Sequence, residues 1–183
     1  MQAKGTAVGS IPLFVKTYHA AQYQTWYDSL SPKAKEIFKE HILASSWYPL
    51  HEAVIEPTQK ICDLFYNGSD KGAWKAGEFS AEHSLKGIYK IFVKVGTPQF
   101  IIKRASNVFS SFYNPSKIEV IDTSSNHVNI HISEFPTPSA MVECRIAGWI
   151  QQALTISGCK TPNVKITTSM TKGSPYTEIA SKW

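Results

Sequence analysis

Residues 77–114, GEFSAEHSLKGIYKIFVKVGTPQFIIKRASNVFSSFYN, decide the expected fold of this chain. They predict two helices that meet at a corner. Gly96 suits the left-handed position that ends a helix, Thr97 can cap the next helix, and Pro98 suits its first turn. Apolar residues recur at helical spacing on both sides of the corner, so each helix needs a partner surface. The two stripes are Leu85, Ile88, Tyr89, Phe92 and Val95, then Ile101, Ala105, Val108 and Phe112.

The chain before this segment predicts mostly helices. A short edge strand is expected over residues 4–8, followed by a break at Gly9-Ser10. Ser31-Pro32 has the form of a cap and first turn, and Pro57 can open a later helix with Ile61, Leu64 and Phe65 facing inward. Residues 69–77 are expected to be a polar link. Residues 45–49, SSWYP, predict a turn or an extended link, because the residue before a proline avoids the helical region.

After Asn114 the apolar period changes from 3.6 to 2, which indicates strands. The expected elements are a hairpin (117–122 and 127–132), a helix from Thr137-Pro138 to about Ser157, and a second hairpin (164–170 and 176–183). Gly158 is expected to end the helix. The apolar stripe expected for the helix consists of Val142, Ile146, Trp149, Ile150 and Ala153. This order predicts an α+β fold, in which a helical N-terminal half is followed by hairpin–helix–hairpin and an antiparallel sheet packs against helices. We expect residues 1–183 to form one domain.

Composition indicates a folded globule, with 43% hydrophobic and 18% charged residues. No apolar run is long enough to span a membrane, and the N-terminus lacks the features of a signal peptide, so we expect a cytoplasmic protein without a membrane span. Cys62, Cys144 and Cys159 are far apart and form no C-x-x-C pair. Reduced thiols in or near the core are therefore expected.

No catalytic constellation can be assembled from the sequence. It holds no G-x-S-x-G elbow, no phosphate-binding glycine loop and no dinucleotide fingerprint. None of the six histidines forms a helical metal pair, and His127 and His131 fall on an expected strand that faces solvent. We therefore expect a protein that is not an enzyme, with no catalytic residues, no metal and no cofactor.

Lysines line one face of the first expected helix at Lys86, Lys90 and Lys94. Two interpretations stay open: a solvated face opposite the apolar stripe, or a docking patch for an acidic partner or a phosphate backbone. Aromatic residues do not alternate with these lysines, so we expect no nucleic acid as a partner. The net charge of +5 is spread along the chain.

Aromatic residues make up 12% of the chain, enough to line a ligand pocket between the central helices and the sheet. The same residues could instead fill a dry core, and the pair in the 45–49 connection could instead plug the end of that core. The candidate pocket walls are Trp47, Tyr48, Tyr89, Phe109, Phe112 and Trp149.

Three stretches resemble a family of single-domain bacterial proteins that is numerous in myxobacteria. They are Phe79–Tyr89, the Ser46-Trp47-Tyr48-Pro49 segment and the Phe135-Pro136-Thr137-Pro138 entry to the late helix, and the final Gly173-x-Pro175 hairpin adds to them. That family is similar to a wider superfamily of heme–nitric-oxide-binding sensor domains, 4-vinyl-reductase-type domains, aromatic-sensing domains of transcription activators and subunits of the TRAPP vesicle-tethering complex. The resemblance implies a non-catalytic α+β module that holds a ligand or a partner and is often dimeric.

The chain departs from these relatives at their metal sites. The position that best matches the proximal histidine of the heme sensors is Phe109, and no Tyr-x-Ser-x-Arg heme-propionate motif is present. The positions that match the zinc-holding cysteines of the 4-vinyl-reductase-type domains are Ser169 and Thr177, and hydroxyls are poor zinc ligands beside thiolates. The resemblance therefore implies degenerate heme and zinc sites.

These observations favour a sensory or binding module that holds a small apolar ligand or signals through a protein partner. The alternative is a homodimeric assembly module with no small ligand.

Overall fold

The computed structural model describes residues 1–85 and 111–183. The predicted corner at Gly96-Thr97-Pro98 and most of its two apolar stripes lie outside these residues. The helical segments are α1 (Gly5–Tyr18), the 3-10 turn η1 (Ala20–Gln22), α2 (Tyr23–Asp28), α3 (Pro32–Lys39), the π-helical turn η2 (His51–Ile55), α4 (Glu56–Phe65), α5 (Lys71–Leu85), α8 (Ala140–Ile156) and the 3-10 turn η3 (Met170–Lys172). The strands are β1 (Gln2–Lys4), β2 (Trp47–Pro49), β3 (Tyr113–Asn114), β4 (Lys117–Thr123), β5 (His127–Ser133), β6 (Asn163–Thr168) and β7 (Thr177–Lys182).

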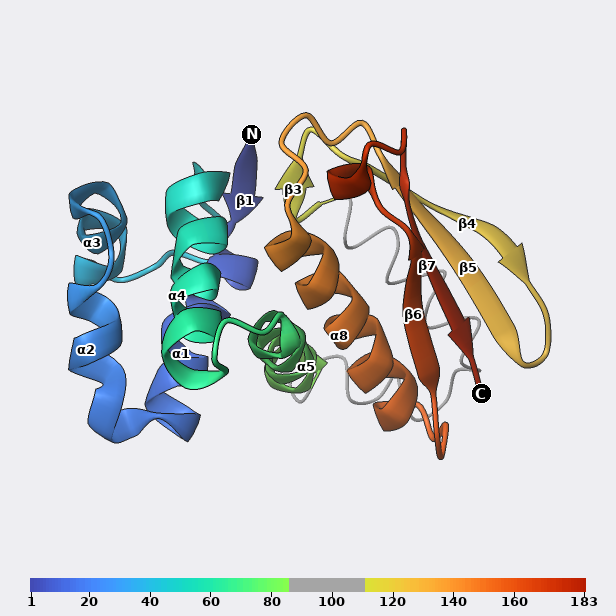
Figure 1. Cartoon of the computed structure of the whole chain (residues 1–183), viewed down its shortest axis with the longest axis horizontal. Helices are drawn as coiled ribbons and strands as arrows, with labels where there is room; N and C mark the ends of the chain where they lie inside the picture. The colour runs from blue at the N-terminus through green and yellow to red at the C-terminus, as the bar shows by residue number, and fades with distance from the viewer. Residues whose placement is uncertain (86–110) are drawn as a thin grey trace.

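The elements form layers, with helix α8 between the N-terminal helices on one side and a four-stranded sheet on the other (Figure 1). The predicted α+β architecture is confirmed. Among the described residues, no helix is both long and apolar enough to cross a bilayer.

The N-terminus begins as a strand and turns at once into a helix. The predicted strand over residues 4–8 and the break at Gly9-Ser10 are wrong, because α1 begins at Gly5 and runs through both residues and through Pro12. Its buried residues fall at helical spacing, and this apolar face outweighs the weak helix propensity of one glycine, about 1 kcal/mol. The buried hydrophobic residues of α1 are Ala7, Val8, Ile11, Phe14 and Val15.

A small sheet with strand order β2-β1-β3 joins the N-terminus to two later segments. Strand β1 pairs with β2 through Ala3 and Tyr48, and with β3 through Ala3 and Tyr113. The turn or extended link predicted for the SSWYP segment is confirmed, because Ser45 lies in a turn and Trp47–Pro49 form β2. The sheet itself was not predicted, because strands of two or three residues show no alternation that a sequence can reveal.

Of three local predictions for the helical half, one is confirmed and two are wrong. The predicted cap is confirmed, since the Ser31 hydroxyl accepts a hydrogen bond from the Ala34 amide at 3.3 Å and Pro32 opens α3. The predicted polar link over residues 69–77 is wrong, because α5 already begins at Lys71. The prediction that Leu64 faces inward is also wrong, since its side chain is 40% exposed.

The main sheet has the order β4-β5-β7-β6 and is antiparallel throughout. The first predicted hairpin is confirmed, and Val128, Ile130 and Ile132 of β5 are all buried. The second hairpin differs in its connection. Strand β6 ends at Thr168, and Met170 belongs to η3 instead of continuing the alternation.

Helix α8 begins two residues later than predicted, since its N-cap is Ser139. Its end is as predicted, because Gly158 takes the left-handed conformation at φ +96°. The apolar stripe predicted for it is buried, but burial extends beyond the stripe to every residue from Met141 to Ile150. A helix between two layers is covered on opposite faces, so burial does not follow one stripe.

Candidate functional site

Two charged side chains lie in the buried part of α8, and they define the candidate site. Glu143 is 5% exposed and Arg145 is 4% exposed. Charged residues are almost never fully buried unless they are paired or functional. No sequence motif assigned either residue to a site. The signal that could have revealed them is a Glu-x-Arg step inside an otherwise apolar helix.

Glu143 is held by hydroxyl groups from the connection between β6 and β7. Its Oε2 accepts a hydrogen bond from Ser169 at 2.6 Å and one from Thr171 at 3.4 Å. Its Oε1 accepts one from Thr177 at 2.5 Å. Both carboxylate oxygens are therefore satisfied, and the cluster ties α8 to the last hairpin.

Ser169 and Thr177 are also the two positions for which the sequence resemblance implied a correspondence with zinc-holding cysteines. The structure brings them together on one carboxylate, 26 and 34 residues away along the chain. Within the part of the chain that the structure describes, no three His, Cys, Asp or Glu residues come close enough to hold a metal ion. Here the hydroxyl–carboxylate cluster is a structural tie between elements.

Arg145 has a different environment from Glu143. Its Nη2 donates to the Ala7 carbonyl oxygen and to Ser10 Oγ, each at 3.2 Å. Its Nε and Nη1 are buried and have no hydrogen-bond partner. Burial lowers the pKa of Arg145, and the Tyr113 hydroxyl beside it partly offsets that effect. The guanidinium is therefore bound at one end and unsatisfied at the other.

Tyr113 lies in β3 beside this guanidinium and is 4% exposed. Its ring packs edge-on against Phe135, with centroids 5.9 Å apart. Burial raises the pKa of Tyr113, while the nearby Arg145 acts in the opposite direction. The phenol is thus a neutral polar group at the edge of an apolar cluster.

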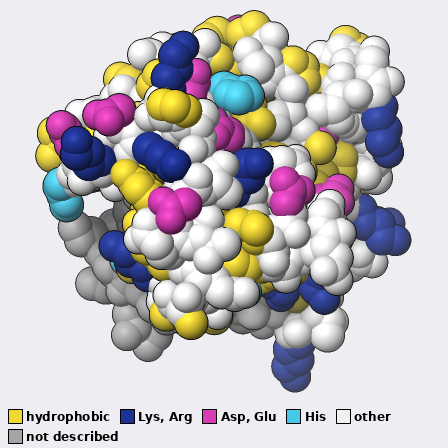
Figure 2. Space-filling view, turned by 60° about the vertical axis from the view of Figure 1, so that its left-hand side comes forward, with side chains coloured by type: hydrophobic (Ala, Val, Ile, Leu, Met, Phe, Trp, Pro, Cys, Tyr) yellow, Lys and Arg dark blue, Asp and Glu magenta, His cyan; other side chains and the backbone are white. Residues whose placement is uncertain are grey.

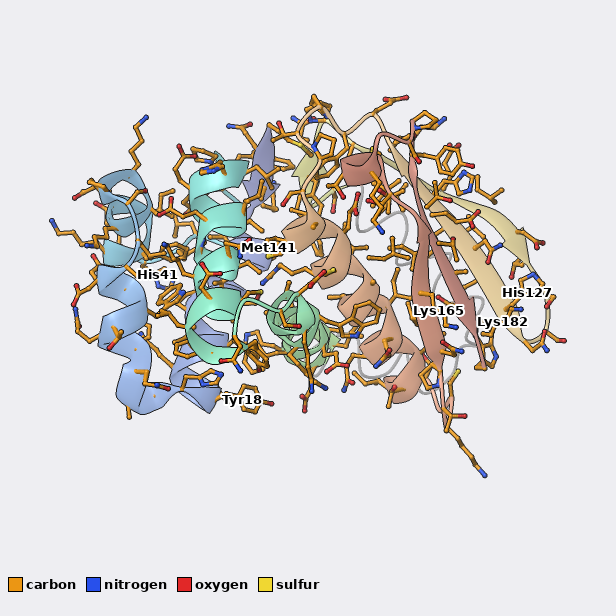
Figure 3. All side chains as sticks on the ribbon, viewed as in Figure 1. Tyr18, His41, His127, Met141, Lys165 and Lys182 are labelled. Carbon is orange, nitrogen blue, oxygen red and sulfur yellow. The ribbon has the colours of Figure 1, made fainter. Side chains whose placement is uncertain are left out.

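Sulfur atoms gather where α4, α5 and α8 meet. The Cys62 thiol donates to the Met141 sulfur at 3.7 Å, and Figure 3 shows Met141 between α8 and α4. The Cys144 thiol donates to Asp70 Oδ2 at 3.8 Å. Burial is the largest cause that raises the pKa of Cys144 to about 12. The prediction of free thiols in the core is confirmed, since all three cysteines are free and buried.

The strand histidines are partly buried instead of facing solvent as predicted. His127 Nε2 lies 2.7 Å from Asp122 Oδ2. His131 Nε2 lies 2.9 Å from Glu178 Oε2, and its ring stacks on Tyr176 at 4.1 Å. Each imidazole is held by a neighbouring carboxylate on the sheet.

The predicted pocket walls are in several different environments. Trp149 is buried in α8, and Phe112 is partly buried against the same core. Trp47 is 36% exposed, and the Lys4 ammonium lies 4.4 Å from its ring centroid. Tyr48 accepts a hydrogen bond from the Leu43 amide at 2.9 Å. Tyr89 and Phe109 lie outside the described residues, so their part in a pocket stays a prediction.

The predicted docking lysines Lys86, Lys90 and Lys94 also lie outside the described residues. On the face that Figure 2 shows, Lys and Arg side chains are interspersed with Asp and Glu. That face carries no concentrated patch of positive charge of the kind that a phosphate backbone requires.

The fold is that of the H-NOX proteins. An H-NOX protein from S. oneidensis, solved in its Fe(II)NO ligation state, superposes with a TM-score of 0.73 and 13% sequence identity over 98% of each chain. The Fe(II) unliganded H-NOX protein from K. algicida gives 0.69 at 8% identity over 98% of this chain and 95% of that one. A mutant of the T. tengcongensis H-NOX protein gives 0.66 at 11% identity over 98% and 96%.

The sequence itself is far from these proteins. No protein-family model matches the chain. No curated protein sequence matches it either.

The residues of this chain do not fit heme held by a histidine on the helix before the first hairpin. The sequence contains no His, Cys or Met between Ser84 and Asn126. Phenylalanine, which stands at position 109, has no lone pair to give to iron. Position 109 of this chain therefore supplies no ligand to heme iron.

Proposed function

We propose that this chain is a non-enzymatic sensory or binding module that holds a small apolar ligand or signals through a protein partner. The observation that carries the proposal is the likeness of fold to the S. oneidensis H-NOX protein over 98% of both chains. A ligand in place of heme would need an apolar interior without an axial ligand. Trp149 of α8 belongs to the main apolar cluster and Phe112 packs against it, which supports assigning both to the walls of that interior.

The loss of both metal sites supports a ligand other than heme. Phe109 replaces the iron ligand, and Ser169 and Thr177 bind Glu143 in place of zinc. The described residues therefore keep the architecture of a ligand-holding domain, while their chemistry favours an organic molecule. Residues 1–183 would act as one α+β domain in this proposal.

Mass spectrometry of freshly purified protein, first native and then denatured, tests the proposal. We expect a bound mass that is released on denaturation. We also expect that adding 1-decanol, a neutral apolar probe, changes the tryptophan fluorescence of wild-type protein. That change should disappear in Trp149→Phe and persist in Trp47→Phe, because Trp47 lies at the surface. An apo protein with no response to the probe would contradict the ligand-holding form of the proposal and leave signalling through a protein partner.

A homodimeric assembly module with no small ligand is the second candidate. It is supported by large apolar side chains at the surface of the described residues, namely Tyr18, Leu43, Leu64 and Ile121, which are 40% to 58% exposed. Light scattering across a range of protein concentrations tests it. A dimer that carries no bound mass would favour this candidate over the first.

A further inference from the structure

Arg145 is a buried cation without a counter-charge. No carboxylate among residues 1–85 and 111–183 forms an ion pair with it. The sequence of residues 86–110 contains neither Asp nor Glu, so this segment supplies none either. A buried charge in a folded protein is normally paired, and Arg145 departs from that rule.

The polar groups around Arg145 are neutral. Burial is the main influence on Tyr113 and on Cys62, and it raises the pKa of each, so neither becomes a phenolate or a thiolate at neutral pH. The Ser10 hydroxyl and the Ala7 carbonyl oxygen carry no net charge and already bind Nη2. The positive charge is therefore solvated by dipoles at one end only.

The unsatisfied end of the guanidinium has a defined donor capacity. Nε carries one N–H group and Nη1 carries two, and no acceptor meets hydrogen-bond geometry at either nitrogen. The nearest polar group that acts on the guanidinium is the neutral Tyr113 hydroxyl, which can accept from at most part of this set of donors. Each unsatisfied buried polar group in a native protein needs an explanation, such as an ion, a ligand or a water molecule. A water molecule would satisfy a donor and leave the charge uncompensated, whereas an anion would satisfy both.

We propose that Arg145 anchors the carboxylate head group of an amphipathic ligand, with the Ser10 and Tyr113 hydroxyls beside it. This inference rests on the proposed function and names the class of its ligand. One unpaired cation matches the single negative charge of a carboxylate, while a phosphate monoester carries about −1.5 to −2 at neutral pH. Charge-assisted hydrogen bonds from arginine to a carboxylate are among the stronger ones in proteins.

The apolar part of the ligand extends along α8 towards Trp149. Residues four apart lie on the same side of a helix, so Trp149 is one turn beyond Arg145 on that side. One helix therefore supplies both the anchor for the ligand's head group and an apolar wall of the proposed pocket. The ligand class that this arrangement selects is a monocarboxylic acid with an aliphatic or aromatic tail.

Isothermal titration of the full-length protein at neutral pH tests the inference with two matched pairs of probes. They are decanoate with 1-decanol, and 3-phenylpropionate with 3-phenylpropanol. We expect at least one carboxylate to bind roughly tenfold or more tightly than its alcohol, as a charge-assisted hydrogen bond implies. That preference should disappear in Arg145→Met and remain in Lys165→Met, which removes a positive charge from the exposed face of β6 (Figure 3).

The outcomes separate the inference from the proposed function. If an acid and its alcohol bind wild-type protein equally well, the anchor is overturned and the ligand-binding module stands. If no probe binds and the purified protein carries no bound mass, the anchor and the ligand-holding form of the proposed function are both overturned. If Arg145→Met fails to fold, the preference of the wild-type protein for acid over alcohol decides whether the anchor stands. Arg145→Lys is then the variant to compare, because it keeps the positive charge and loses the planar fork of donors.

Discussion

A Cβ atom on Gly77 would lie 2.1 Å from the carbonyl oxygen of Arg145, so helices α5 and α8 cross with their backbones in contact. The contact is reciprocal, because a Cβ atom on Gly148 of α8 would lie 2.1 Å from the carbonyl oxygen of Trp74 in α5. Small residues at such crossings allow two helices to approach more closely than side chains permit. This crossing fixes where α8, and with it Glu143 and Arg145, sits relative to the helical half.

Substitution of Gly77 by alanine should therefore destabilise the protein. Backbone atoms cannot move aside as a flexible side chain can, so we expect a loss of at least about 1–3 kcal/mol in the free energy of unfolding. Urea denaturation followed by circular dichroism measures it. The control is Gly9→Ala in α1, where the nearest atom to the new Cβ is 3.8 Å away and a gain of up to about 1 kcal/mol is expected. Equal effects of both changes would contradict the tight crossing.

Loss of the Thr177 hydroxyl should weaken the tie between α8 and the last hairpin. Thr177→Val keeps the shape of the side chain and removes two hydrogen bonds, the one that Thr177 donates to the buried Glu143 carboxylate and the one that it accepts from the Met170 amide. We expect a loss of about 1.5–3 kcal/mol in urea denaturation, as for hydrogen bonds to charged groups. Thr17→Val is the matched control, because the Thr17 hydroxyl is exposed and bonds only to the Leu13 carbonyl oxygen of its own helix. A Thr177→Val protein as stable as this control would show that Glu143 does not depend on the cluster.

Arg145→Met should leave the ligand-free protein as stable as the wild type or more so. Replacing a buried, uncompensated charge with an apolar side chain of similar volume removes its desolvation penalty, and comparable replacements of buried ion pairs have gained about 1–4 kcal/mol. The measurement is the urea midpoint of protein freed of bound molecules by refolding. A loss of more than about 1 kcal/mol would mean that Arg145 is compensated in the free protein.

His19 should make stability fall as the pH is lowered. Burial lowers the pKa of His19 below its ordinary value of 6.5, so the unfolded chain binds a proton more readily than the folded protein. The stability contributed by the neutral imidazole is therefore present above pH 6.5 and is lost as the pH falls from there towards the folded pKa.

Replacement of His19 by phenylalanine should remove this dependence while keeping the stack on Phe65, where the ring centroids are 4.0 Å apart. We expect the melting temperature of His19→Phe to fall less than that of wild type over the acidic range. His83→Phe serves as the control, since His83 is exposed and stacks on Phe79 in a similar way. Parallel pH profiles for wild type and His19→Phe would contradict the prediction.

Local signals in the sequence determined much of the fold. The change of apolar period after Asn114 predicted the β4–β5 hairpin, the Ser31-Pro32 cap predicted α3, and Gly158 predicted the end of α8. Each of these features depends on residues within one turn or one strand, so the local sequence is enough to predict where the element begins or ends. The same kind of local signal wrongly predicted a break at Gly9-Ser10, which lies inside α1, and a link over residues 69–77, where α5 begins at Lys71.

Tertiary structure alone decided the role of each glycine and each buried charge. A glycine that breaks a helix and one that lets two helices touch, as Gly77 does, look identical in sequence, because the difference lies in a neighbour 68 residues away. Ser169 and Thr177 were predicted to replace zinc ligands, but their common partner Glu143 emerged only from packing. Arg145 became a candidate anchor in the same way, because burial and a missing counter-charge are properties of how distant segments pack, and the sequence of one helix does not contain them.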